Sequence, residues 1–256
     1  MAERNKTAEP ELIYTDDDII VVSKPAGMPV HEAKHSTDRT LVDWLLERFP
    51  EIENVGDVPA DEAQAIARVQ AIHLYRPGIV HRLDKLTSGV MVVARNQESF
   101  LRLKELFQSR AVIKVYLALA CGHLKERRGT ITGALGRLAS SPTKMGVLGA
   151  RGGIRMPKEA VTEYAVLEQF SAAALLEVRP KTGRMHQIRV HLASIGHPVA
   201  GDVVYGGKNV CFKELKRQFL HAATLSFAFR EGQMLSFSAE LPEELEELLE
   251  ELRKLH

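Results

Sequence analysis

Short runs of β-branched and other apolar residues recur along this chain, and their spacing limits what it can fold into. They predict strands at residues 19–22, 89–94, 111–120, 161–167 and 174–179. Helical patterns do not alternate strictly with these runs, which argues against a doubly wound α/β fold. We therefore expect an α+β fold, with helices that flank a mixed or antiparallel sheet.

Turn and capping residues mark further elements. Glu231-Gly232, between two apolar runs, predicts a closing hairpin. Thr40 and Asn96 can each cap a helix, because apolar residues follow both at three- and four-residue steps. A helix is also expected over residues 185–195, and a C-terminal helix has Pro242 in its first turn.

Composition and length bound the class of protein. The chain has 256 residues, of which 45% are hydrophobic and 26% charged, as in ordinary globular domains. No clear linker divides it, so we expect one domain over residues 12–256 after a flexible tail, residues 1–11. No apolar run reaches the roughly 20 residues of a membrane helix, and the polar N-terminus lacks the apolar core of a signal peptide. We expect a soluble, cytoplasmic protein.

The two cysteines give no sign of a metal or redox site. Cys121 and Cys211 lie far apart in the sequence, without partners at ligand spacing. A cysteine in such a setting usually packs as a small apolar side chain. We expect both to be buried thiols, and nothing in the sequence calls for an oxidising compartment.

Charge is unevenly distributed along the chain. The net charge is +1, but residues 137–189 hold nine Lys or Arg and four Asp or Glu. Residues 240–256 hold seven Glu and two basic residues. Such a distribution can produce one positive face and one acidic end, to which a phosphate backbone would respond. Charges scattered over a solvated surface fit the counts equally well.

Two segments show no clear periodicity. Residues 51–75 are acidic and rich in alanine, which predicts a loop with one short helix. Residues 137–158 are rich in Gly, Ser and basic side chains, which predicts a mobile excursion. The glycines of this second segment lack the following Lys-Ser/Thr of a phosphate loop, so nucleotide binding is not expected.

Asp84 is the first candidate for chemistry. It lies in a short polar loop, residues 81–85, before the strand at residues 89–94. Because Arg82 and Lys85 flank it, its carboxylate should stay ionised and can act as a nucleophile or a base. The alternative is a turn in which Asp84 and its neighbours only satisfy backbone groups.

A second cluster spans residues 181–191. His186 and Arg189 are three residues apart and share a face if this segment is helical, while Arg184 and the helix N-terminus can hold a phosphate. A solvated basic face is the alternative. His186 and His191 are five residues apart rather than the four of a helical zinc pair, so we expect no metal site.

Lys114 and Tyr116 form the third candidate. Strand alternation puts both on one face of residues 111–120, away from Val115. A strand tyrosine usually packs against its neighbours, but its ring can also stack on a base.

Together these segments resemble the RluA family of pseudouridine synthases. Residues 81–89 resemble the signature loop of that family, residues 114–116 its second motif and residues 183–191 its third. Weaker likenesses lie at residues 24–27, 196–198 with 201–202, and 220–222, and all occur in the order of the family.

The resemblance implies a mixed, bent sheet with a central RNA-binding cleft, and no cofactor or metal. It implies that Asp84 attacks the target uridine, that Arg189 pairs with Asp84, and that Tyr116 stacks on the base or moves a proton. Arg82 would fill the space of the flipped nucleotide. The remaining candidates for RNA binding are His81, Thr87, Lys114, Arg184, His186 and Gln187.

The expected substrate is ribosomal or transfer RNA with a stem-loop, bound by a monomer without an obligatory protein partner. Since few residues precede the first strand, no S4 domain is expected, and residues 51–75 and 137–158 would select the RNA. Two alternative functions stay open. The chain could be a catalytically silent RNA-binding protein, or a glycoside-type hydrolase with Asp202 as its second acid.

Overall fold

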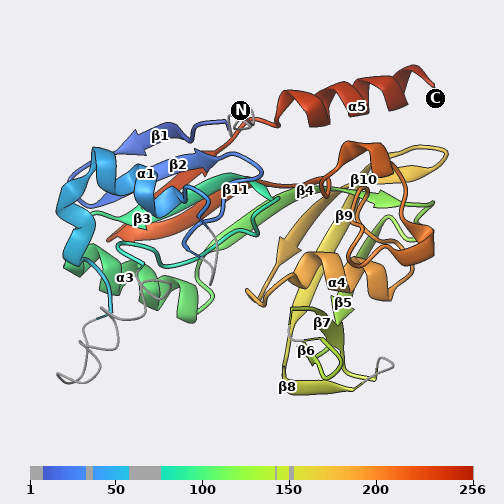
Figure 1. The fold of residues 1–256 in the computed structure, drawn as a ribbon, viewed down its shortest axis with the longest axis horizontal. Coiled ribbons are helices and arrows are strands. Elements are labelled where there is room, and N and C mark those ends of the chain that lie inside the picture. Colours follow the sequence, from blue (N-terminus) through green and yellow to red (C-terminus); the bar gives the residue numbers. More distant parts are fainter. Residues whose placement is uncertain (1–7, 33–36, 58–75, 142, 150–152, 256) are drawn as a thin grey trace. The chain divides into compact units, whose positions relative to one another are not determined.

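The computed structural model describes residues 8–32, 37–57, 76–141, 143–149 and 153–255, and Figure 1 shows its elements. The chain forms two compact units. The first unit consists of Met1–Val112 and Leu225–Ala239. The second unit consists of Ile113–Thr224 and Glu240–His256. Both contain helices and strands, and the expected α+β fold is confirmed. That residues 12–256 act as one domain stays a prediction.

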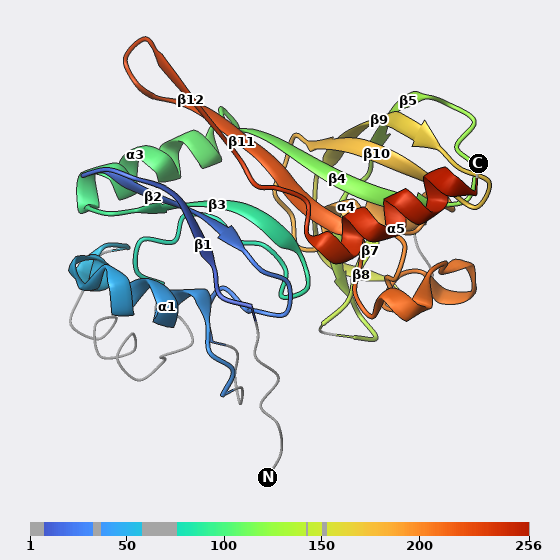
Figure 2. The same ribbon diagram turned by 90° about the horizontal axis from the view of Figure 1, so that it is seen from above.

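A sheet forms the core of the first unit. Its order is β1 (Glu11–Thr15), β2 (Ile19–Lys24), β3 (Ser88–Ala94) and the later part of β11 (Leu220–Arg230), with β12 (Gln233–Ser238) paired to β11. The β1–β2 and β2–β3 pairs are antiparallel. The side chains of β2 and β3 are buried on both faces, which explains their unbroken apolar runs. The predicted hairpin is confirmed, and Gly232 turns it at φ 71° (Figure 2).

The helices of the first unit start where their capping residues predict. Thr40 accepts a hydrogen bond from the Asp43 amide at the start of α1 (Leu41–Arg48), and a short 3-10 helix, η1 (Pro50–Asn54), follows. Asn96 accepts one from the Ser99 amide at the start of α3 (Gln97–Gln108). Most of the predicted loop over residues 51–75 lies outside the described residues.

The second unit is built on a run of hydrogen-bonded strands. Its order is the first part of β11, β4 (Ile113–Cys121), β10 (Ala173–Pro180), β9 (Val161–Gln169) and β5 (Arg128–Thr132). Val178 of β10 lies opposite Tyr116 of β4 on one side and Tyr164 of β9 on the other. Gly129 of β5 lies opposite Tyr164, and a Cβ there would be 2.6 Å from the tyrosine ring. The ring therefore lies over the glycine.

Two helices complete the second unit. The predicted helix over residues 185–195 is α4 (Gln187–Ser194). The predicted C-terminal helix is α5 (Glu243–Lys254), and Pro242 is its N-cap residue rather than part of its first turn. The buried leucines of α5 belong to the same core as β4 and β10. Two short 3-10 helices, η3 (Gly207–Asn209) and η4 (Lys213–Leu215), follow α4. Within the described residues, no helix is long and apolar enough to cross a membrane.

The prediction of a mobile excursion over residues 137–158 is wrong. Its described residues form a three-stranded sheet with the order β7 (Met145–Val147), β6 (Leu135–Leu138) and β8 (Ile154–Lys158), which lies near α4 in Figure 1. Gly136 and Gly146 pair across this sheet. A Cβ on Gly136 would lie 2.5 Å from the Arg155 carbonyl oxygen, so this glycine permits close packing rather than a flexible loop.

The expectation of two free thiols is also wrong. Cys121, at the end of β4, forms a disulfide with Cys211, 90 residues later. Backbone hydrogen bonds bring the two segments together, because the Cys121 amide donates to Pro198 O and the Gly201 amide donates to Cys211 O. Neither residue carries a local sequence signal for this contact.

Reduction of this disulfide should destabilise the second unit. Because it closes a loop of 90 residues, its loss should lower the free energy of unfolding by about 2–4 kcal/mol. Chemical denaturation with and without a dithiol reductant measures the change, and the Cys121→Ser/Cys211→Ser variant should not respond to the reductant. Two reactive thiols in the native protein without reductant would contradict the assignment.

Candidate active site

The Asp84 loop lies in the first unit, directly before β3. Leu83 is buried and anchors the loop, Asp84 is half-buried, and Arg82 is exposed. The Asp84 carbonyl accepts a hydrogen bond from the Thr87 amide at 3.0 Å. This turn fixes the backbone on both sides of the Asp84 carboxylate, as a reacting group requires.

A buried lysine holds this loop from behind. Lys24 is fully buried, and its Nζ donates to Pro25 O and Met28 O, each at 2.8 Å, and to Lys85 O at 3.2 Å. The Gly27 amide donates to the same Lys85 carbonyl. The ammonium thus ties residues 25–28 to the residue after Asp84. In the sequence this segment shows only a strand-breaking composition and a weak family likeness.

His81 and Thr87 make contacts inside the first unit. The His81 Nε2 accepts a hydrogen bond from the Val92 amide at 3.1 Å, and its ring stacks on Phe107 with 4.5 Å between centroids. Thr87 is buried. These contacts stabilise the loop, and RNA binding by either residue stays a prediction.

In the second unit, β4 carries Lys114 and Tyr116, both half-buried. Tyr116 packs against the core of this unit. The register places it on one face of the sheet with Val178 and Tyr164. A contact between Tyr116 and RNA stays a prediction.

Arg189 of α4 forms a buried ion pair with Asp202. Its Nε donates to Oδ2 at 2.6 Å and its Nη2 donates to Oδ1 at 2.9 Å, while the two side chains are 7% and 1% exposed. The Val204 and Tyr205 amides also donate to Asp202 Oδ1. This two-point contact fixes the plane of the guanidinium. The predicted pairing of Arg189 with Asp84 stays a prediction.

His186 and Tyr205 lie beside this pair. The Tyr205 hydroxyl is 2.6 Å from His186 Nδ1 and accepts a hydrogen bond from the Met145 amide at 3.0 Å. The Tyr205 ring centroid is 5.0 Å from the Arg189 guanidinium carbon. His186 has φ 55°, a left-handed backbone that costs roughly 1 kcal/mol or more without supporting contacts.

Gln187 is buried, and its side chain makes four hydrogen bonds within the second unit. Its Oε1 accepts from the Thr182 hydroxyl and the Arg184 amide, and its Nε2 donates to Val161 O and Thr162 Oγ1. With two hydrogen bonds accepted and two donated, the amide side chain reaches its full hydrogen-bonding capacity. These bonds hold the turn that carries Arg184, and RNA binding by Gln187 stays a prediction.

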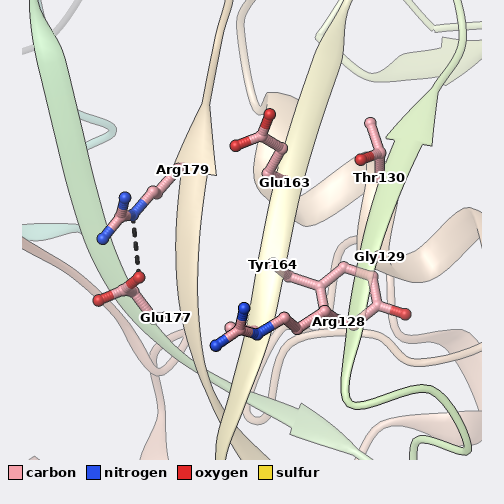
Figure 3. A pocket seen from close by; sticks show the side chains of 8 residues that line it. Arg128, Gly129, Thr130, Glu163, Tyr164, Glu177 and Arg179 are labelled. Carbon is pink, nitrogen blue, oxygen red and sulfur yellow. Dashed lines mark hydrogen bonds and ion pairs between the residues drawn. The ribbon is translucent and has the colours of Figure 1, made fainter.

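A hollow of about 500 Å³ opens on the same sheet, and Figure 3 shows its lining. Its charged residues include Arg128, Glu163, Glu177 and Arg179, and Arg179 Nε pairs with Glu177 Oε1 at 2.9 Å. Glu177 and Arg179 flank Val178 in β10, so they point to the face opposite Tyr116. Tyr164, which shares the face of Tyr116, also lines this hollow. Among the described residues, no His, Cys, Asp or Glu cluster could hold a metal ion.

Comparisons with known sequences point to one family. A family model described as RNA pseudouridylate synthase matches residues 18–194. The ribosomal large subunit pseudouridine synthase D of Nitrosomonas europaea is 38% identical, over 96% of this chain and 66% of that protein. An uncharacterised RNA pseudouridine synthase of Bacillus subtilis is 38% identical, over 96% of this chain and 75% of that protein. The chain thus spans between 66% and 75% of the length of these two relatives.

Solved structures agree. The human RNA pseudouridylate synthase domain containing 1 protein aligns with a TM-score of 0.72 and 27% identity, over 98% of both chains. The human domain containing 4 protein aligns with a TM-score of 0.70 and 27% identity, over 95% of this chain and 93% of that chain.

Removal of the Asp202 charge should destabilise the second unit. Asp202→Asn removes the charge that Asp202 supplies to the buried Arg189 guanidinium, and the free energy of unfolding should fall by about 3 kcal/mol. Chemical denaturation measures it. The double variant Arg189→Gln/Asp202→Asn should lose less than the sum of the two single losses. An Asn variant as stable as the wild type would contradict the structural role of the pair.

His191 should make stability depend on pH. It is buried between Thr162 Oγ1 and Gly133 O, and burial lowers its pKa below the 6.5 of an exposed histidine. The unfolded chain therefore binds a proton near pH 6.5 that the folded chain does not, so stability should be full above that pH and fall as the pH drops below it. Denaturation at pH 7.5 and 5.5 tests this. His191→Gln should show a smaller loss on acidification, and an equal loss would contradict the assignment.

Proposed function

This chain belongs to the RNA pseudouridylate synthase family, whose enzymes isomerise uridine to pseudouridine in RNA, and we propose that Asp84 is its nucleophile. The family suggested by the sequence motifs is thereby confirmed. We propose ribosomal RNA as the substrate, because a relative at 38% identity is named as acting on the ribosomal large subunit. Transfer RNA is the second candidate. The enzyme would act in the cytoplasm as a monomer.

The observation that carries the role of Asp84 is its setting. A half-buried carboxylate lies in a loop fixed by buried Leu83 and by the Lys24 ammonium, beside the exposed guanidinium of Arg82. A surface turn without a reaction to perform needs no buried ammonium, whose desolvation is costly unless it is fully hydrogen-bonded. A nucleophile does need such fixed geometry.

The proposed reaction conserves all atoms of the nucleotide. Asp84 attacks the uridine, the N1–C1′ bond breaks, and the detached uracil turns. A C5–C1′ bond then forms as the bond between the sugar and the Asp84 carboxylate breaks and frees the nucleophile, C5 loses its proton and N1 gains one. Tyr116 stacks on the base or moves a proton at the sugar, and Arg189 orients the carboxylate. Arg82 occupies the gap left by the flipped nucleotide, whose extrusion costs a few kcal/mol.

The three-stranded sheet is the proposed RNA contact. Residues 133–158 contain five basic residues and no acidic one. Within the described residues, Arg137, Lys144, Arg155 and Lys158 are exposed there. Such a surface suits phosphate groups, and RNA contacts from it can offset the cost of base flipping.

The hydrolase alternative is weakened by Asp202. A glycoside-type hydrolase needs a second carboxyl group at the reacting bond. Asp202 is buried, and both of its carboxylate oxygens accept hydrogen bonds from Arg189. It is therefore poorly placed to act as an acid or a base. A silent RNA-binding protein remains the alternative that experiment must test.

Asp84→Asn should abolish activity and leave RNA binding intact. The nucleophile is lost, so pseudouridine formation should fall at least roughly a thousandfold, while the affinity for RNA changes little. Transcripts of large-subunit ribosomal RNA and of transfer RNA, analysed by mass spectrometry of their nucleosides, measure the product. Asp17→Asn, at an exposed turn of the first unit, is the matched control and should keep full activity. Comparable pseudouridine formation by wild type and Asp84→Asn would overturn the proposal.

A further inference from the structure

Tyr205 lies between the proposed RNA-binding sheet and the arginine of the proposed site. We propose that it is a positioning residue with two separable parts, a ring that orients Arg189 and a hydroxyl that ties His186 to β7. This inference rests on the proposed function. Tyr205 is half-buried in the turn after Asp202, where sequence reasoning identified no site residue.

The ring lies against one face of the Arg189 guanidinium. Asp202 binds its Nε and Nη2 edge, and the face of Tyr205 lies 5.0 Å from its central carbon. A carboxylate fixes the guanidinium in its plane, and an aromatic face restricts movement out of that plane. Because Arg189 is buried, this cation–π contact is worth more than one in water.

The hydroxyl joins two elements that are far apart in the sequence. It accepts the Met145 amide of β7 at 3.0 Å and lies 2.6 Å from His186 Nδ1. His186 is the residue that starts α4, in a left-handed backbone conformation, and Arg189 lies three residues later. A hydroxyl contact at His186 therefore supports the first turn of the helix that carries Arg189.

The two parts should affect different steps of turnover. β7 belongs to the sheet whose exposed basic side chains are proposed to contact RNA. Loss of the hydroxyl removes the hydrogen bond from β7 and leaves the ring on Arg189, so it should weaken RNA binding. Loss of the ring disturbs Arg189 itself, so it should slow the chemical step.

Two variants of this residue separate the parts. Tyr205→Phe keeps the ring, so KM for the RNA transcript should rise roughly fivefold to tenfold from the lost hydrogen bonds, with kcat within about twofold of wild type. Tyr205→Leu removes both parts, so kcat should also fall roughly tenfold or more. Tyr14→Phe, which removes an exposed tyrosine hydroxyl of β1 that bonds to Asp16, is the matched control and should change neither constant.

The outcomes distinguish this inference from the proposed function. Equal kinetic constants for wild type, Tyr205→Phe and Tyr205→Leu would overturn the positioning role, and so would equal losses of kcat in both variants. Circular dichroism checks folding, and if Tyr205→Leu does not fold, an unchanged KM of Tyr205→Phe overturns the proposal by itself. No pseudouridine from the wild-type enzyme on any RNA would instead overturn the proposed function.

Discussion

The second unit depends on the buried ion pair between Arg189 and Asp202. A guanidinium below the protein surface is tolerated only when its charge and its donors are matched, and Asp202 supplies the opposite charge and accepts from Nε and Nη2. The turn that supplies this carboxylate is itself closely packed. Gly201 has φ 72°, and a Cβ there would lie 2.0 Å from the Arg217 carbonyl oxygen, so only glycine fits. Arg189 is thereby held in one orientation before any RNA binds.

The first unit uses a buried cation in a similar way. Lys24 donates to three backbone carbonyls, one of them in the residue after Asp84. In both units a charge that is costly to bury orders a segment that carries proposed chemistry. Few side chains then need to move when the substrate arrives, which is the condition for efficient positioning of a reacting group.

Local signals in the sequence predicted most elements, and long-range contacts account for what was missed. Thr40 and Asn96 cap helices because their own side chains bond to nearby amides. The exposed edge strand β1 carries no buried apolar run, so no periodicity revealed it. The disulfide joins residues 90 positions apart. Gln187 was expected to bind RNA because it lies in the third motif of the family resemblance, and only the fold shows that its amide makes hydrogen bonds inside the second unit.

The central claim is that this enzyme isomerises uridine in RNA through Asp84. The most direct test maps pseudouridine in the ribosomal and transfer RNA of cells that lack the gene. The account predicts that one or a few positions lose pseudouridine, and that the wild-type gene restores them while the Asp84→Asn gene does not. An unchanged pseudouridine map in cells without the gene, or restoration by the Asp84→Asn gene, would contradict it.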